Sequence, residues 1–264
     1  MAMSPRKRAQ VSRWIQYAVL AAIVIVVVLV ADWAVIGDKF TNPEIAVAMF
    51  PDVLVTALKN TVLYTTCGFA FGLALGLVLA LMRLSSVGPY RWMSTTFIEF
   101  FRGVPALVVF LALSVGVPTA FPGYLVPGGT LGIATLALGL VGAAYMAETI
   151  RAGIQAVPKG QMEAARSLGM SHARGMVSIV IPQAFRIILP PLTNELILLT
   201  KDSSLVYLLG YTAATVELTS FGREVLNQEK NMTPIFVIAL CYLLITIPLS
   251  MVVRRMEARA ERAR

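Results

Sequence analysis

Six long apolar segments constrain this chain more than any other feature. They cover residues 14–36, 53–82, 97–115, 130–150, 187–209 and 232–253. A helix of about 20 apolar residues spans the hydrocarbon core of a bilayer, and each segment reaches or nearly reaches that length. A backbone in lipid must satisfy its own hydrogen bonds, and the apolarity is continuous rather than alternating, so we expect helices and not a barrel. The sequence therefore predicts an all-α polytopic integral membrane protein with about six transmembrane helices.

The composition agrees with a lipid environment. Hydrophobic residues make up 58% of the chain and charged residues only 14%, whereas soluble domains have about 25% charged residues. The net charge of +8 does not indicate nucleic-acid binding, because the cations flank apolar segments instead of forming a basic face interleaved with aromatic residues. Cys67 and Cys241 lie within apolar segments and are interpreted as small buried hydrophobic residues.

The distribution of Lys and Arg predicts the orientation. Most of them fall on one side of the membrane if both termini lie in the cytoplasm, as the positive-inside rule requires. The first apolar segment is longer than a signal-peptide core, so we expect an uncleaved helix. The predicted organisation is a basic tail, extra first helix and outer loop over 1–50, a core over 51–257, and a basic cytoplasmic tail over 258–264.

Three glycines in the second apolar segment recur at every fourth residue. Gly68, Gly72 and Gly76 share one helix face, where small side chains allow another helix to approach closely. We expect this face to pack within the chain, with dimerisation as the alternative. No strand precedes the glycines and no Gly-Lys-Ser/Thr follows, so the chain has no phosphate-binding loop of its own.

The longest predicted cytoplasmic loop, residues 151–186, has an unusual pattern. Gln161–Leu168 predicts a short helix, Gly169 ends it, and a second helix runs toward Pro182. A helix–glycine–helix loop between two membrane spans has no lipid in which to bury apolar side chains. We therefore expect a groove on a partner protein to cover them. The side chains concerned are Met162, Ala165, Leu168 and Met170.

The same loop resembles the permease subunits of ATP-binding-cassette (ABC) importers. The residues that match the family signature are Glu163, Ala164, Ala165, Gly169, Ile179 and Pro182. Ile181 stands where the family usually has leucine. The resemblance implies that the loop is a coupling helix seated in a cleft of an ATPase subunit, with Gly160 and Leu168 also in the contact. Glu163 is then an interface and helix-positioning residue, because the alternative role of general acid has no evident partner or pocket.

The resemblance extends from about Asp52 to Glu257. The stretches 99–107, 147–154 and 200–206 are similar to the polar amino-acid uptake subfamily, with Val109 where a glutamine is common. It implies a bacterial plasma-membrane permease working by alternating access. Its partners would be a second permease subunit (the same chain or a homologue), cytoplasmic ATPase subunits that bind ATP and Mg, an external solute-binding protein and a polar amino acid. The chain itself would bind no cofactor and catalyse no reaction.

Charged residues inside apolar segments indicate a candidate substrate path. Asp, Lys or Arg at the centre of a membrane helix costs about 2.5–3.5 kcal/mol, so such residues face a bundle interior or an aqueous path. Two interpretations stay open for Lys201 and Asp202: an ion pair that locks helices, or a lining of the path. The other candidates for the path are Asn194, Glu195, Ser203 and Arg102.

Other classes of function fit the sequence less well. An ATP-independent carrier or channel would explain the helices and the buried charges, but it would leave the 151–186 loop without a purpose. A membrane-embedded enzyme would need a recognisable catalytic arrangement, and none is evident. His172 is the only histidine and has no Cys or His neighbours, so no metal site is expected.

Overall fold

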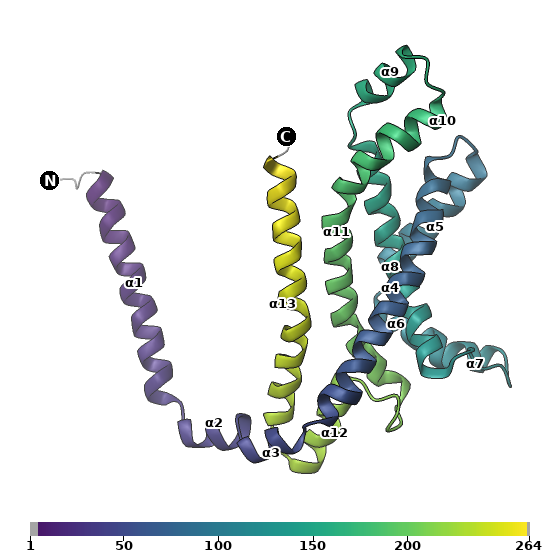
Figure 1. The fold of residues 1–264 in the computed structure, drawn as a ribbon. Coiled ribbons are helices and arrows are strands. Elements are labelled where there is room, and N and C mark those ends of the chain that lie inside the picture. Colours follow the sequence, from purple (N-terminus) through teal and green to yellow (C-terminus); the bar gives the residue numbers. More distant parts are fainter. Residues whose placement is uncertain (1–4, 263–264) are drawn as a thin grey trace.

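The computed structural model describes residues 5–262, and over that range all regular elements are helices (Figure 1). The outermost residues of the two predicted basic tails, 1–4 and 263–264, lie outside the described part of the chain. The elements in chain order are α1 Pro5–Val30, α2 Trp33–Phe40, α3 Pro43–Ala48, η1 Val53–Leu58, α4 Lys59–Leu84, α5 Gly88–Gly103, α6 Ala106–Leu111, η2 Ala112–Gly116, α7 Val117–Ala120, α8 Gly129–Gln155, α9 Lys159–Ser167, α10 His172–Gly175, η3 Met176–Val180, α11 Ile181–Asp202, η4 Ser203–Leu209, α12 Leu218–Glu229 and α13 Thr233–Arg262.

Five helical stretches are long and apolar enough to cross a membrane, and a bent pair would make a sixth. The five include α1, α4, α8, α11 and α13, with the short helical turns that continue α4 and α11. This confirms the predicted all-α, multi-span fold. Figure 1 shows α1 standing apart from the other helices, and none of its apolar window is buried.

The third predicted segment, 97–115, is not one straight helix, and the prediction is wrong there. The chain breaks after α5 and resumes as α6, and the two arms are bent by 104°. Val104 adopts an extended conformation with φ −95° and ψ 130°. The cause is Pro105, which has no backbone N–H and disfavours helical geometry in the residue before it.

The fifth predicted segment begins earlier than expected. The predicted segment started at residue 187, but the helical stretch runs from His172 to Leu209, and Pro190 and Pro191 lie inside α11. Lys201 and Asp202 consequently occupy the end of α11 and not the middle of a span.

The glycine face of α4 packs against α8 of the same chain. A Cβ added at Gly72 would lie 3.0 Å from the carbonyl oxygen of Gly139, and one at Gly76 would lie 3.0 Å from the carbonyl oxygen of Ala143. At Gly68 the nearest atom would be the Cβ of Leu138, at 2.7 Å. These contacts are too close for a larger side chain, so the absence of Cβ atoms sets the distance between α4 and α8.

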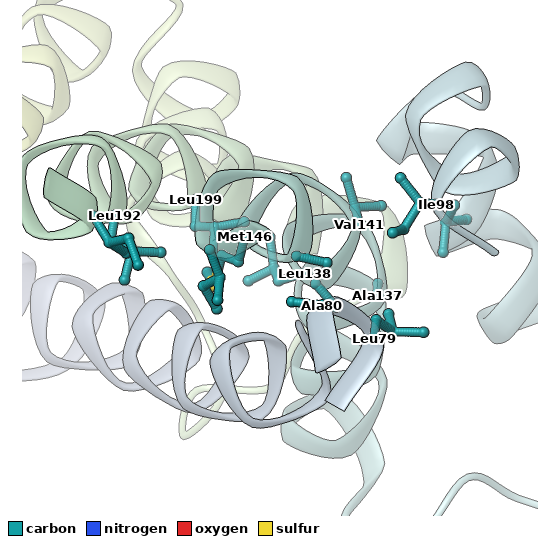
Figure 2. Packing of buried hydrophobic residues seen from close by; sticks show 14 of the residues in the cluster. Leu79, Ala80, Ile98, Ala137, Leu138, Val141, Met146, Leu192 and Leu199 are labelled. Carbon is teal, nitrogen blue, oxygen red and sulfur yellow. The ribbon is translucent and has the colours of Figure 1, made fainter. Parts of the chain in front are cut away.

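Helix α11 packs antiparallel to α8, and two contacts fix the register. A Cβ at Gly142 would lie 3.2 Å from a methyl carbon of Leu199, and one at Gly153 would lie 2.2 Å from Ile188. The residue numbers rise along one helix as they fall along the other. Figure 2 shows buried residues of α4, α5, α8 and α11, among them Leu138, Met146 and Leu199, forming one core.

The ends of the bundle differ. At one end of the bundle, residues 210–217 connect η4 to α12 and are hydrogen-bonded to α4. The Asn60 side chain of α4 donates to the carbonyl oxygens of Ala214 and Val216, at 2.9 and 2.8 Å. Tyr64 donates to Thr215 at 2.7 Å. The opposite end carries α9 and α10 (Figure 1). We call these the α12 end and the α9 end.

Candidate functional site

A cavity of about 520 Å³ opens where the chain breaks between α5 and α6. The break supplies the backbone from Gly103 to Pro105, α8 supplies Tyr145, and α11 supplies Glu195 and Asp202. The full lining is Arg102, Gly103, Val104, Pro105, Ala106, Val141, Tyr145, Glu195, Leu198 and Asp202. The helix break and the acidic face of α11 therefore border one open cavity that carries charged side chains on a largely apolar lining.

Arg102 stacks on an aromatic ring at this cavity. Its guanidinium carbon lies 5.7 Å from the centre of the Tyr145 ring, which is within the range of a cation–π contact. The contact joins the last turn of α5 to α8 and leaves the guanidinium N–H groups able to donate. Tyr145 was not singled out from the sequence, because its role depends on a helix that is distant along the chain.

The predicted path residues separate into two groups. Arg102, Glu195 and Asp202 line the cavity. Asn194 and Lys201 are exposed and lie outside its lining, and Ser203 is buried with its hydroxyl donating to the carbonyl oxygen of Thr200 at 2.7 Å. Glu195 and Asp202 are seven residues apart and so lie on one face of α11.

The predicted coupling loop forms a helical hairpin made of α9, α10 and η3. Gly169 has φ +81°, a left-handed conformation that favours glycine and ends α9. Ser171 caps α10, and its side chain accepts from the Arg174 N–H at 3.3 Å. The Gln183 side chain of α11 donates to that of Gln161 at 3.3 Å and so joins the two arms.

The apolar side chains of the hairpin have different surroundings. This corrects part of the expectation that a partner protein covers all of them. Ala165 is buried inside the hairpin, where Met162 also packs against Gly175. These two need no outside partner, because the hairpin covers them itself. Leu168 is 84% exposed. The remaining predicted coupling residues, Gly160, Glu163, Ala164 and Pro182, are exposed as well.

A charged cluster beside the hairpin ties two membrane helices together. The Glu148 carboxylate of α8 accepts from Arg83 of α4 at 3.0 Å and also pairs with Arg151 one turn further along α8. Glu148 and Arg151 are three residues apart on one helix, a spacing at which side chains meet. The partner on α4 was not expected, because it lies 65 residues away along the sequence.

A buried carboxylate organises the α12 end. Glu217 is fully buried, and its carboxylate accepts from the backbone N–H groups of Thr219 and Ser220, at 2.6 and 2.7 Å. It also accepts from the Ser220 hydroxyl at 2.8 Å. Burial raises the pKa of Glu217 above its ordinary value, and these hydrogen bonds oppose the rise. Glu217 thereby caps α12, and the Tyr242 hydroxyl of α13 donates to the same carboxylate at 3.4 Å.

Comparison with known protein families gives one match over most of the chain. Residues 72–262 match the model of the family described as the binding-protein-dependent transport system inner membrane component. The match includes the α9–α10 hairpin and the three charged residues of the cavity.

Individual relatives agree with the family match. The chain is 38% identical over 205 residues to the probable glutamine ABC transporter permease protein GlnM of Bacillus subtilis, covering 77% of this chain and 91% of that one. It is 35% identical over 217 residues to the L-cystine transport system permease protein TcyB of the same organism, covering 81% and 88%. A crystal structure of an amino acid ABC transporter with histidines contains a chain that aligns with a TM-score of 0.72 at 36% identity, covering 81% of this chain and 96% of that one.

Proposed function

The chain belongs to the family of binding-protein-dependent transport system inner membrane components, and on that premise we propose that it is the permease subunit of an ABC importer for polar amino acids. In this role it hydrolyses no ATP, and a partner subunit binds ATP and Mg. The α9 end, with both termini, faces the cytoplasm of a bacterial cell, and the α12 end faces the external solute-binding protein.

The observation that carries the proposal is the α9–α10 hairpin. It forms the end of the bundle opposite to α12 (Figure 1). Its arms are joined by the Gln183–Gln161 hydrogen bond, and Leu168 is an exposed apolar side chain at the end of α9. An exposed leucine on a short amphipathic helix fits a hydrophobic groove on a cytoplasmic partner. A carrier that worked without an ATPase would have no use for such a surface.

The hairpin continues directly into α11, which carries the acidic face of the cavity. A displacement of α9 by the partner would therefore move Glu195 and Asp202 relative to Arg102 on α5. The tight α4–α8 packing favours a rigid-body movement of helices over local deformation. We infer that this movement opens the cavity alternately to the two sides of the membrane, with a second permease subunit completing the path.

The names of the relatives support amino acids as the solute, since they refer to glutamine, cystine and histidines. The cavity carries side chains of both charge signs, which a zwitterion can pair with. Arg102 can bind a carboxylate, and Glu195 or Asp202 can bind an ammonium group.

Affinity purification of the tagged chain from its own host tests the proposal. We expect an ATPase subunit to co-purify in a 1:1 ratio, and the purified complex in vesicles to take up a polar amino acid only with ATP and the solute-binding protein present. Uptake by the permease alone, driven by an ion gradient, would instead establish an ATP-independent carrier.

A further inference from the structure

An apolar groove lies where α11 and α13 pass α4. It contains a cavity of about 320 Å³, to which α11 contributes Leu196 and α13 contributes Leu244 and Pro248. Leu244 is 62% exposed, so the groove is open at the surface of the bundle. Three threonines also line it, and each hydroxyl donates to the carbonyl oxygen four residues earlier in its own helix: Thr65 at 2.8 Å, Thr66 and Thr200 at 2.7 Å. The groove therefore offers space for a hydrocarbon chain.

Three exposed arginines continue both walls of the groove toward the α9 end. Arg186 precedes Thr200 by fourteen residues, which is close to four helical turns, so both lie on one face of α11. On α13, Arg255 and Arg259 follow Pro248 by seven and eleven residues, close to two and three turns. These two arginines therefore lie on the face of α13 that lines the cavity. Figure 1 shows that α11 begins and α13 ends on the side of the bundle that carries α9.

The positive charge of these arginines is not neutralised within the described chain. None of the three forms an ion pair with another residue of the range 5–262. On α13, Glu257 and Glu261 each stand two residues after one of the arginines, about 200° round the helix and so on another face. Glu148 of α8 already pairs with Arg83 and Arg151. The walls of the groove consequently attract an anion from outside the chain.

The distance from the arginines to the cavity matches one leaflet of a bilayer. Arg186 lies ten residues from Leu196, and Arg259 lies eleven residues from Pro248. Ten or eleven residues of α-helix rise about 15 to 17 Å. The hydrocarbon core of a bilayer is about 30 Å thick, so one leaflet contributes about 15 Å. With the arginines at the level of the lipid phosphates, the cavity lies where the acyl chains end.

We propose that the groove between α11 and α13 binds a phospholipid with an anionic headgroup, from the leaflet on the side of the α9 end. Arg186, Arg255 and Arg259 bind the headgroup phosphate, and an acyl chain occupies the cavity. Basic residues between membrane helices on the cytoplasmic side are typical of sites for anionic headgroups. A zwitterionic headgroup would bring its own cation close to the arginines, so net negative charge is favoured. The inference requires a membrane-spanning chain but does not depend on the transported solute.

Native mass spectrometry of the full-length chain, in the complex in which it is purified, tests the proposal. The probe is an equimolar mixture of phosphatidylglycerol and phosphatidylcholine with the same acyl chains. We expect phosphatidylglycerol to be retained at least about tenfold more than phosphatidylcholine, because one additional charge-assisted hydrogen bond is worth about a factor of ten. Equal retention of the two lipids would contradict the anionic preference.

A double variant tests the headgroup contact. Arg186→Gln combined with Arg255→Gln should reduce the preference for phosphatidylglycerol at least about tenfold without changing the melting temperature, since both residues are exposed. Arg254→Gln is the matched control. It removes the same charge at the same level of α13, but about 100° round the helix from Arg255, and it should retain the preference. An equal loss in the control would show general attraction to the basic surface and overturn the groove as the site.

The acyl-chain contact has its own variant. Leu244→Trp places a large side chain in the cavity and should lower the retention of phosphatidylglycerol several-fold, whereas Leu243→Trp changes an exposed neighbour outside the lining and should not. Unchanged retention in Leu244→Trp would show that no acyl chain occupies the cavity. If the wild type retains neither lipid and Leu244→Cys cross-links two chains, the groove is a contact between subunits and the lipid site is wrong.

Discussion

The α4–α8 interface and the α9–α10 hairpin are built in opposite ways. At the interface, Gly72 and Gly139 bring two helices so close that an added Cβ would lie 3.0 Å from a backbone oxygen. In the hairpin, Gly160 and Gly169 have open space around their Cβ positions, and Leu168 is 84% exposed. The interface is completed within the chain, whereas the hairpin presents a surface for another molecule. Transmission of a movement from a partner requires both features: helices packed so tightly that they move together, and an exposed surface to which the partner binds.

The largest expected effect is at the interface. Gly72→Leu places a branched side chain against the backbone of α8, where no flexible group can move aside. Overpacking of this kind costs on the order of 3 kcal/mol. We expect a markedly lower melting temperature and little folded protein in the membrane. Gly37→Leu is the control, since nothing lies within 4 Å of its Cβ position. Equal melting temperatures for wild type and Gly72→Leu would show that the α4–α8 packing is not rigid.

The next largest effect is expected on binding of the ATPase subunit, without a change in the fold of the permease. Leu168→Asp puts a charge on the exposed apolar contact. We expect the affinity for the ATPase subunit to fall at least about tenfold, as for a central interface residue. The melting temperature of the permease alone should not change. Ser167→Asp adds the same charge next to it, and should have little effect because the Ser167 hydroxyl donates back to the Glu163 carbonyl oxygen of its own helix. Co-purification yields of the two variants measure the difference.

The smallest effect comes from the same kind of substitution, glycine to alanine, made once in the hairpin and once in the α4–α8 interface. Gly160→Ala meets open space in α9 and should stabilise the hairpin by up to about 1 kcal/mol, since alanine is the better helix former. In the α4–α8 interface, Gly68→Ala places a Cβ 2.7 Å from the Cβ of Leu138 and should destabilise the protein. Thermal melting and hydrogen exchange of the hairpin distinguish these results. Melting-temperature changes of the same sign in both variants would contradict the contrast between the two regions.

The sequence predicted the features that depend on local patterns. Apolar segment lengths predicted the spans, and the spacing around Gly169 predicted a helix that ends there. The break at Pro105 also has a local cause, but the apolarity of residues 97–115 concealed it. What was missed depends on contacts between distant segments. The exclusion of Lys201 from the cavity, the ring of Tyr145 under Arg102 and the pairing of Arg83 with Glu148 all require the helix packing, which the order of residues alone does not specify.

The central claim is that the α9–α10 hairpin couples ATP hydrolysis in a partner to movement of this bundle. Solute-stimulated ATPase activity of the reconstituted complex tests it most directly, with Glu163→Lys and Gly169→Asp as variants. Both residues are exposed, so neither change buries a charge in lipid, and Glu257→Lys, an exposed acid near the end of α13, serves as the control. We predict that both hairpin variants insert into the membrane normally but lose at least about nine-tenths of the stimulation, while the control retains it. Normal stimulation in both hairpin variants would contradict the account.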